Sequence, residues 1–232
     1  MSDAPILLDS RADMVRALAA IVFDMDGTLF DSRTVVPDSY IAAIVKLGGR
    51  AYEREQIVAA YPVGPPRAMI GHLLGRECSQ EDLDVYHAIL SEAAAGLRAY
   101  PGLREALDEL SAAVPLAVFS GASTQACRIL LEACDLASLF PVVLGADEVA
   151  RPKPAPDGIV EACRRLGVDV TASAYVGDAP YDLEAARRSG AVAVAAAWGH
   201  LFRPGLPADL VVQTPADLRD LIGPWPSERP AS

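Results

Sequence analysis

Short apolar runs recur along the chain, and segments with apolar residues at helical spacing separate most of them. The runs that resemble buried strands cover residues 19–24, 115–120, 142–147, 173–178, 191–198 and 209–212. A strand covered on both faces is apolar throughout, so such runs are typical of a parallel sheet. Two of the intervening helical patterns end at Gly167 and Gly190, which suit helix C-caps. The alternation predicts an α/β fold with an open parallel sheet and right-handed crossovers.

Residues 33–100 interrupt this alternation because they contain no strand-like run. Their apolar spacing predicts four helices, near residues 38–48, 53–60, 66–74 and 80–96. Ser79 and Asp82 form the pattern of a capping box at the start of the last one. We therefore predict a helical insertion in an α/β core. The expected division is a core of residues 1–32 and 101–222, a cap of residues 33–100 and a mobile tail of residues 223–232.

Composition and charge limit the classes of partner. The 232 residues, 52% of them hydrophobic, suffice for one core domain with a smaller insert. No apolar run reaches the roughly 18 residues of a membrane span, and no secretory signal is recognised, so we expect a cytoplasmic protein. The formal net charge is −11, nearly all of it outside the cap. This charge opposes binding to nucleic acid or anionic membranes, and an anionic substrate would need a cation to approach the core.

Polar side chains follow several predicted strands at their carboxyl ends. Asp24 and Asp26 follow the first strand, Ser120 ends the second, and Asp178 ends the fourth. Ligands of open parallel sheets bind at this edge. Carboxylates that converge there repel one another, so we expect a hard cation with oxygen ligands, such as Mg²⁺. Lys153, one of only two lysines, follows the third run and would offer a compact charge to a phosphoryl oxygen or a carboxylate.

In their order along the chain, these residues resemble the motifs of the haloacid dehalogenase superfamily, its phosphatase branch in particular. Residues 24–28 match the first motif, D-x-D-G-T. Ser120 matches the Ser or Thr that closes a strand, and Lys153 matches the Lys that precedes a helix. Gly177 and Asp178, with Asp182, match the fourth motif. Together the matches lie within residues 19–190, which is most of the chain.

The resemblance implies a Rossmann-like core with a helical cap inserted after the first motif, and a role for each matched residue. Asp24 would be the nucleophile that forms an aspartyl phosphate, and Asp26 the general acid and base. The groups that would hold the phosphoryl oxygens are Gly27, Thr28, Ser120, Gly121 and Lys153. Asp24, the backbone carbonyl of Asp26 and Asp178 would bind Mg²⁺. Asp182 would support the metal waters or the lysine from behind.

Other positions near the motifs are less informative. Gly121 and Ala122 follow the second motif where many relatives have an asparagine, a difference that would alter how the leaving group is held. We assign no chemistry to Asp31 and Ser32 and expect them to cap the first segment of the cap. In the cap, Arg67 is our candidate for a residue that meets the substrate.

We predict a Mg²⁺-dependent phosphatase of a small phosphorylated metabolite, similar to phosphoglycolate phosphatase. A sugar phosphomutase of the β-phosphoglucomutase kind shares every core residue and stays open as an alternative. A non-catalytic phosphate-binding or regulatory relative is an alternative of another class. Asp26 argues against a dehalogenase or a phosphonate hydrolase, and a signalling receiver domain would separate its acid pair from its phosphorylated aspartate. The sequence does not name the substrate, and both a monomer and a homodimer are reasonable.

Overall fold

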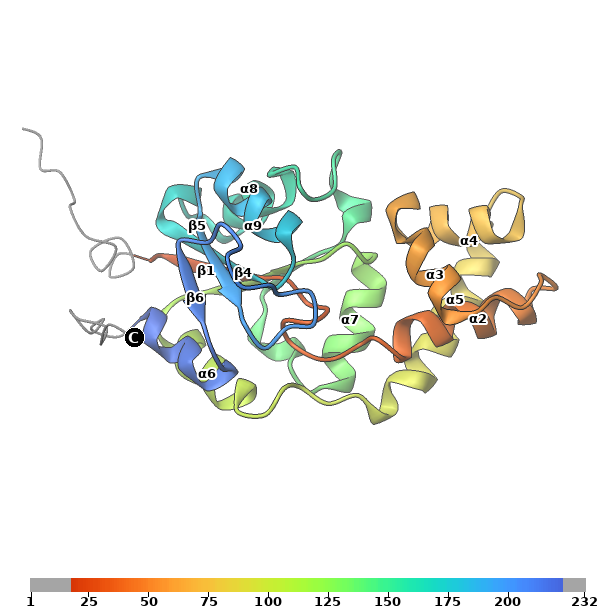
Figure 1. Ribbon diagram of the computed structural model, residues 1–232, viewed down its shortest axis with the longest axis horizontal. Coiled ribbons are helices and arrows are strands. Elements are labelled where there is room, and N and C mark those ends of the chain that lie inside the picture. The colour runs from red at the N-terminus through yellow and green to blue at the C-terminus, as the bar shows by residue number, and fades with distance from the viewer. Residues whose placement is uncertain (1–17, 223–232) are drawn as a thin grey trace, which may run out of the picture.

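The apolar runs form a six-stranded sheet in the computed structural model, which describes residues 18–222 (Figure 1). The strands are β1 (Ala20–Phe23), β2 (Leu116–Phe119), β3 (Val142–Leu144), β4 (Ser173–Gly177), β5 (Val192–Ala196) and β6 (Leu210–Val212). Every neighbouring pair is parallel, in the order β3-β2-β1-β4-β5-β6. The predicted parallel α/β sheet is confirmed. The strand order reverses beside β1, which is where open parallel sheets form their ligand sites.

Helices cover both faces of the sheet because successive strand residues point to opposite sides (Figure 1). Val22 packs in the cluster formed with α8 (Asp157–Leu166) and α9 (Pro180–Ser189). Ile21 and Phe23 pack in the other cluster, with α6 (Leu103–Ala113) and α7 (Thr124–Ala133). All four residues of β1 are buried, so the strand is fully apolar up to the point where the acids begin.

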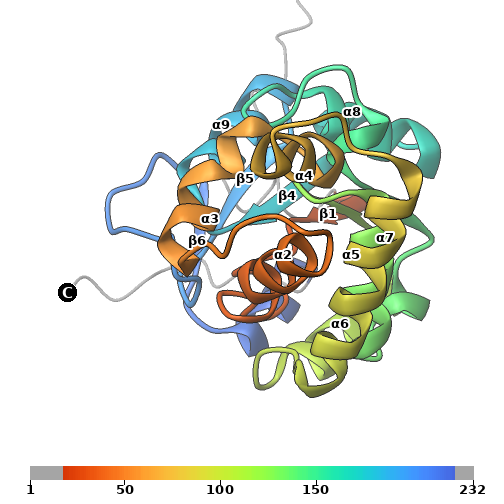
Figure 2. The same ribbon diagram turned by 90° about the vertical axis from the view of Figure 1, so that its right-hand side faces the viewer.

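Four helices lie between β1 and α6 in the sequence and gather at one end of the molecule (Figure 1). They are α2 (Val35–Lys46), α3 (Arg54–Ala60), α4 (Pro66–Leu74) and α5 (Gln80–Ala93). Seen from that end, they lie in front of the central strands (Figure 2). Their buried residues belong to the same hydrophobic cluster as those of α6 and α7, and α5 packs against α7. We call α2 to α5 the cap helices.

Most predicted boundaries agree with the structure to within a few residues, and the exceptions have local causes. Helix α4 has the predicted limits. Helix α2 begins at Val35, three residues before the predicted start, since a proline such as Pro37 is tolerated in a first helical turn. The run 142–147 was wrongly predicted as strand to its end. The strand stops at Leu144, and Asp147 instead accepts a hydrogen bond from the N–H of Thr124 at the start of α7 (2.8 Å).

The predicted mobile tail of residues 223–232 lies outside the described residues. Within residues 18–222, no helix combines the length and the apolar character that crossing a membrane requires.

Candidate active site

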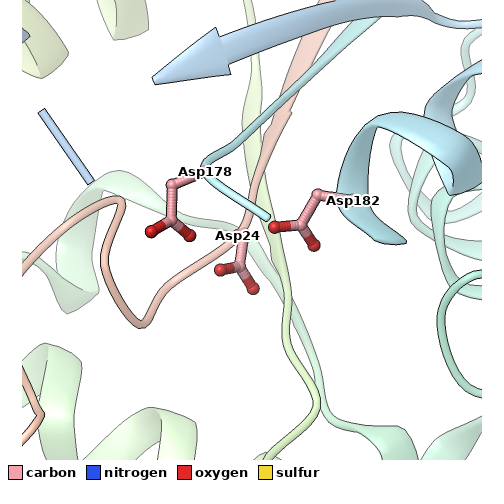
Figure 3. A group of neighbouring side chains, drawn as sticks. All are labelled: Asp24, Asp178 and Asp182. Atoms are coloured by element: carbon pink, nitrogen blue, oxygen red, sulfur yellow. The ribbon is translucent and has the colours of Figure 1, made fainter. Parts of the chain in front are cut away.

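The first motif forms the turn in which the central strand ends. The backbone N–H of Asp24 donates to the carbonyl of Val176 in β4 (2.8 Å), and its buried carboxylate lies beside Asp178 and Asp182 (Figure 3). Gly27 has a φ of +82°, and an added Cβ would lie 2.5 Å from Oδ2 of Asp178. Only glycine adopts this conformation freely and lets the turn approach the carboxylate.

The ammonium group of Lys153 joins two of these carboxylates. Its Nζ lies 2.5 Å from Oδ1 of Asp24 and 2.7 Å from Oδ1 of Asp182, and it donates to the hydroxyl of Tyr175 (3.2 Å). The side chain is only 7% exposed, with the ring of Tyr181 centred 5.6 Å from Nζ. Burial by itself would lower the pKa of Lys153, but Asp182 and Asp24 raise it well above its usual value. The amine is therefore positively charged at neutral pH.

Three carboxylates at this edge could hold a cation. One oxygen from each of Asp24, Asp178 and Asp182 lies within 4.8 Å of the other two (Figure 3). Oδ1 of Asp178 is buried and has no hydrogen-bond partner among the described residues, while its Oδ2 accepts from the N–H of Leu201 (2.9 Å). Both oxygens of Asp182 already accept hydrogen bonds, from protein groups. An unsatisfied carboxylate oxygen amid excess negative charge fits a hard cation such as Mg²⁺.

Burial and mutual repulsion raise the pKa values of the neighbouring acids. Burial first, and then the charge of Asp24, raise the pKa of Asp178 to about 7 and that of Asp26 to about 6. The same two causes raise the pKa of Asp182. A divalent cation would favour the charged forms and lower all three values. Metal binding and proton binding at this cluster are therefore coupled.

Asp26 is held at the end of the turn by a serine for which no chemistry was predicted. The hydroxyl of Ser32 donates to Oδ1 of Asp26. The expectation that Asp31 and Ser32 cap the first cap segment holds for Asp31, whose carboxylate accepts from the N–H of Arg33 (3.1 Å) and pairs with its guanidinium. It is wrong for the Ser32 side chain, and no side-chain cap precedes α2. The N–H of Gly27 donates to the carbonyl of Phe30 (2.9 Å) and closes the turn, which directs Ser32 back to the site.

The other predicted phosphate-binding residues lie at the same sheet edge. Thr28 is fully buried, and its hydroxyl has no partner within the described part of the chain. Ser120 follows β2; its N–H donates to the carbonyl of Leu144 (3.0 Å), and its hydroxyl accepts from the N–H of Ala122 (3.2 Å). Gly121 is exposed, with open space where a Cβ would be. A buried hydroxyl without a protein partner suits a ligand oxygen.

Arg67 lies apart from the acidic cluster, in the first turn of α4. Its guanidinium donates to the carbonyl of Cys78 (2.9 Å) and to Oε1 of Gln80 (2.7 Å), both within the cap. Among residues 18–222, no hydrogen bond or ion pair connects it with Asp24 or Asp178. Its contact with a substrate stays a prediction.

The loop after β5 contributes groups that the sequence analysis did not predict. Nε1 of Trp198 donates to the carbonyl of Thr28 (3.0 Å). A Cβ on Gly199 would lie 2.1 Å from Cβ of Asp178, and Nδ1 of His200 lies 3.9 Å from Oδ2 of the same aspartate. The available signal was the position of these residues at the end of the apolar run 191–198 and directly after it, which places them at the carboxyl edge of the sheet.

Comparisons of sequence and fold relate the chain to known hydrolases. The family model for haloacid dehalogenase-like hydrolases matches residues 21–196. A protein of Dickeya dadantii (strain 3937) named "Probable phosphatase IndB" is 35% identical over 188 residues, which are 77% of this chain and 81% of that protein. A phosphoglycolate phosphatase of Aquifex aeolicus is 27% identical over 207 residues, 88% of this chain and 97% of the relative. The crystal structure of CbbY from Rhodobacter sphaeroides in complex with phosphate has the same fold, with a TM-score of 0.73. The match covers 87% of this chain and 96% of that one, at 22% sequence identity. With its sheet, its cluster of acids and a family match over most of its length, the chain belongs to the haloacid dehalogenase-like hydrolases.

Proposed function

We propose that this protein is a Mg²⁺-dependent phosphatase that hydrolyses a small phosphomonoester through an aspartyl phosphate on Asp24. The observation that supports this best is the environment of the Asp24 carboxylate. Lys153 holds one oxygen at 2.5 Å, and the other accepts no hydrogen bond from the described residues. That oxygen is available to attack a phosphorus atom. The curated relatives, which are named as phosphatases, support the same reaction class.

In the first step, the Asp24 carboxylate attacks phosphorus and the bond between phosphorus and the ester oxygen breaks. Asp26 donates a proton to the leaving oxygen, which departs as an alcohol. Burial raises the pKa of Asp26 and so favours its protonated form, which suits the group to this transfer. The Ser32 hydroxyl, which donates to the Asp26 carboxylate, orients it.

In the second step, the Asp26 carboxylate takes a proton from water as that water attacks phosphorus. The bond between phosphorus and the Asp24 oxygen breaks, which releases inorganic phosphate and restores the free carboxylate. Asp26 thus serves as acid and then as base, and its position two residues from the nucleophile lets it reach the same phosphorus centre.

The phosphoryl oxygens would be held by Lys153, the hydroxyls of Thr28 and Ser120, and backbone N–H groups beside Gly27 and Gly121. When bound by Asp24, Asp178 and the backbone carbonyl of Asp26, Mg²⁺ would supply positive charge that neutralises these oxygens. Asp182 would position Lys153, since one of its oxygens accepts from Nζ at 2.7 Å and the other from the N–H of Ala179 at 3.0 Å.

Residues 33–100 would act as a cap over this site, and the rest of residues 1–222 as the catalytic core. The cap helices lie in front of the central strands when the molecule is viewed from their end, and this position supports the division (Figure 2). The cytoplasmic location and the state of association stay predictions.

Phosphate release from an aryl phosphate and a panel of small phosphomonoesters tests the proposal. We expect activity with Mg²⁺, none in EDTA, and a loss of at least about a thousandfold in Asp24→Asn, as for other covalent nucleophiles. Asp31→Asn is the matched control, because Asp31 is in the same segment but pairs with Arg33 at the surface. Full activity in Asp24→Asn would refute the mechanism. Isomerisation of a sugar phosphate without net phosphate release would favour the phosphomutase.

A further inference from the structure

A cavity of about 690 Å³ lies between the cap helices and the core. Arg67, Asp84 and His87 line it from the cap, and Gln125 and Asp147 line it from the core. Its volume is typical of pockets that bind small molecules. None of the residues to which we assign a part in phosphoryl transfer lines it.

The core side of this cavity adjoins the proposed phosphoryl site. Ser123, which also lines it, is three residues after Ser120, in the loop that joins β2 to α7. Asp147 follows β3, the neighbour of β2 at the same sheet edge. The two loops are joined by a hydrogen bond from the N–H of Ala146 to the carbonyl of Ala122 (2.8 Å). The cavity therefore borders the loop that follows Ser120, one of the residues proposed to hold the phosphoryl group.

The cap side of the cavity is connected to the core by one histidine. Nε2 of His87 lies 3.3 Å from the hydroxyl of Ser123, a hydrogen bond between cap and core. The His87 ring also packs against Tyr86, with centroids 5.4 Å apart, and Tyr86 stacks on Tyr40. Burial lowers the pKa of His87, so its imidazole is neutral at pH 7. It offers a hydrogen-bonding nitrogen and no charge.

The charges around the cavity do not favour an anion. Asp84 and Asp147 are both carboxylates, and Arg67 is the cation among the lining residues. Both terminal nitrogens of Arg67 are already engaged, and its partner Gln80 donates in turn to Asp84 (3.0 Å). The side-chain amide of Gln125 makes no hydrogen bond within the described part of the chain. Beside the apolar Pro65 and Leu83, the lining thus combines carboxylate acceptors with an amide and an imidazole, groups that match hydroxyls, which both donate and accept.

We propose that this cavity binds a neutral, hydroxyl-rich part of the substrate, and that the substrate is therefore a sugar or polyol phosphate and not a phosphorylated carboxylic acid. The inference rests on the proposed phosphatase activity and adds the chemical class of its leaving group. A two-carbon acid would leave most of the cavity unfilled, and its carboxylate would face the exposed carboxylates of Asp84 and Asp147.

A comparison of substrates tests the inference separately from the activity itself. With the full chain and Mg²⁺, we expect kcat/KM for hexose and pentitol monophosphates to exceed that for phosphoglycolate by tenfold or more. A preference for phosphoglycolate, with phosphate release intact, would overturn the inference and leave the phosphatase standing. Absence of phosphate release from every compound, the aryl phosphate included, would overturn both.

Two variants locate the effect in the cavity. Gln125→Leu should lower the ratio of kcat/KM for the best sugar phosphate to that for the aryl phosphate by about tenfold, mostly through KM, the effect of one or two lost hydrogen bonds. Gln213→Leu, at an exposed glutamine beyond the opposite edge strand β6, is the control. An equal loss on both substrates would contradict binding of the leaving group by Gln125.

Asp84→Asn tests the charge argument. Removal of this carboxylate should raise kcat/KM for a phosphorylated sugar acid relative to the corresponding neutral sugar phosphate several-fold, because one source of repulsion is gone. Asp220→Asn removes an exposed charge in the short helix Pro215–Leu221, which packs against α6, and should leave the ratio unchanged. An unchanged ratio in Asp84→Asn would overturn the assignment of a neutral group to this cavity.

Discussion

At the scale of residues, the site depends on side chains that are absent as much as on those that are present. Gly27, Gly177 and Gly199 each leave a space in which a Cβ would collide with Asp178 or Asp182. Thr28 and Asp178 meanwhile have buried oxygens without partners among residues 18–222. Since an unpaired buried polar atom is costly, these oxygens indicate a site arranged for a ligand.

Gly27→Ala is expected to disrupt this arrangement. The variant meets a steric cost from its φ of +82° and a second one from a Cβ 2.5 Å from Asp178. We expect a loss of at least about 1 kcal/mol in the free energy of unfolding together with weaker Mg²⁺ binding and activity, measured by thermal unfolding, titration and phosphate release. Gly48→Ala is the matched control, because Gly48 has the same φ and open space around it. Equal effects of the two substitutions would contradict the role given to Gly27.

Asp178 is expected to make the metal-free protein less stable as the pH rises. Its folded-state pKa is raised from 3.8 to about 7. Between these values the folded state binds more protons than the unfolded state, so the free energy of unfolding falls with rising pH from about 4 to about 7. Below this window the penalty is absent, and above it the penalty is complete. Asp26 contributes with the same sign up to its own pKa of about 6.

Thermal unfolding in EDTA across this pH range measures the effect. The difference in stability between Asp178→Asn and the wild type should grow in favour of the variant from pH 4 to pH 7. Mg²⁺ should stabilise the wild type more at pH 8 than at pH 5, since it competes with protons for the carboxylates. Asp220→Asn, at an exposed acid, should differ from the wild type by the same amount at every pH and should keep the wild-type response to Mg²⁺. A difference independent of pH would contradict the assigned shift.

At the scale of elements, sequence patterns predicted the helices of the cap well where local chemistry defines their ends. Helix α5 begins at the predicted capping box: the N–H of Asp82 donates to the Ser79 hydroxyl (3.1 Å), and the N–H of Ser79 donates to the Asp82 carboxylate (2.8 Å). The end of β3 was not predictable from apolar character, because Asp147 accepts a hydrogen bond from Thr124 at the start of α7, which is distant in sequence. The side-chain bond from Ser32 to Asp26 likewise depends on the path of a turn.

Ser79→Ala should destabilise the protein by about 1 kcal/mol, because it removes the side-chain half of this capping box. Chemical denaturation of the wild type and the variant measures the change. Ser91→Ala is the control, because Ser91 is exposed near the end of the same helix and makes no hydrogen bond within the described chain. An effect of the control as large as that of Ser79→Ala would show that the capping box does not determine the stability of α5.

At the scale of the whole molecule, the sheet explains why motifs far apart in sequence form one site. Parallel strands bring their carboxyl ends to a common edge, so Asp24, Ser120 and Asp178 were predictable as neighbours from their positions after apolar runs. The contact of Lys153 with a carboxylate was among the expectations, and the place of Trp198 and His200 follows from the apolar run that they end, but their contacts and the cavity beneath the cap were not predictable. They depend on side-chain conformations and on the packing of α5 against α7, neither of which has a local sequence signal.

The most direct test of the central claim is to trap the covalent intermediate on Asp24. Asp26→Asn should still accept a phosphoryl group from an aryl phosphate, whose leaving group needs little protonation, but should hydrolyse it slowly without its base. Acid quenching followed by peptide mass spectrometry should then find one phosphoryl group on Asp24, in the presence of Mg²⁺ and not in EDTA, and none in a variant that also carries Asp24→Asn. A phosphoryl group on another residue, or turnover by the wild type with no modified Asp24 peptide under any quench, would contradict the account.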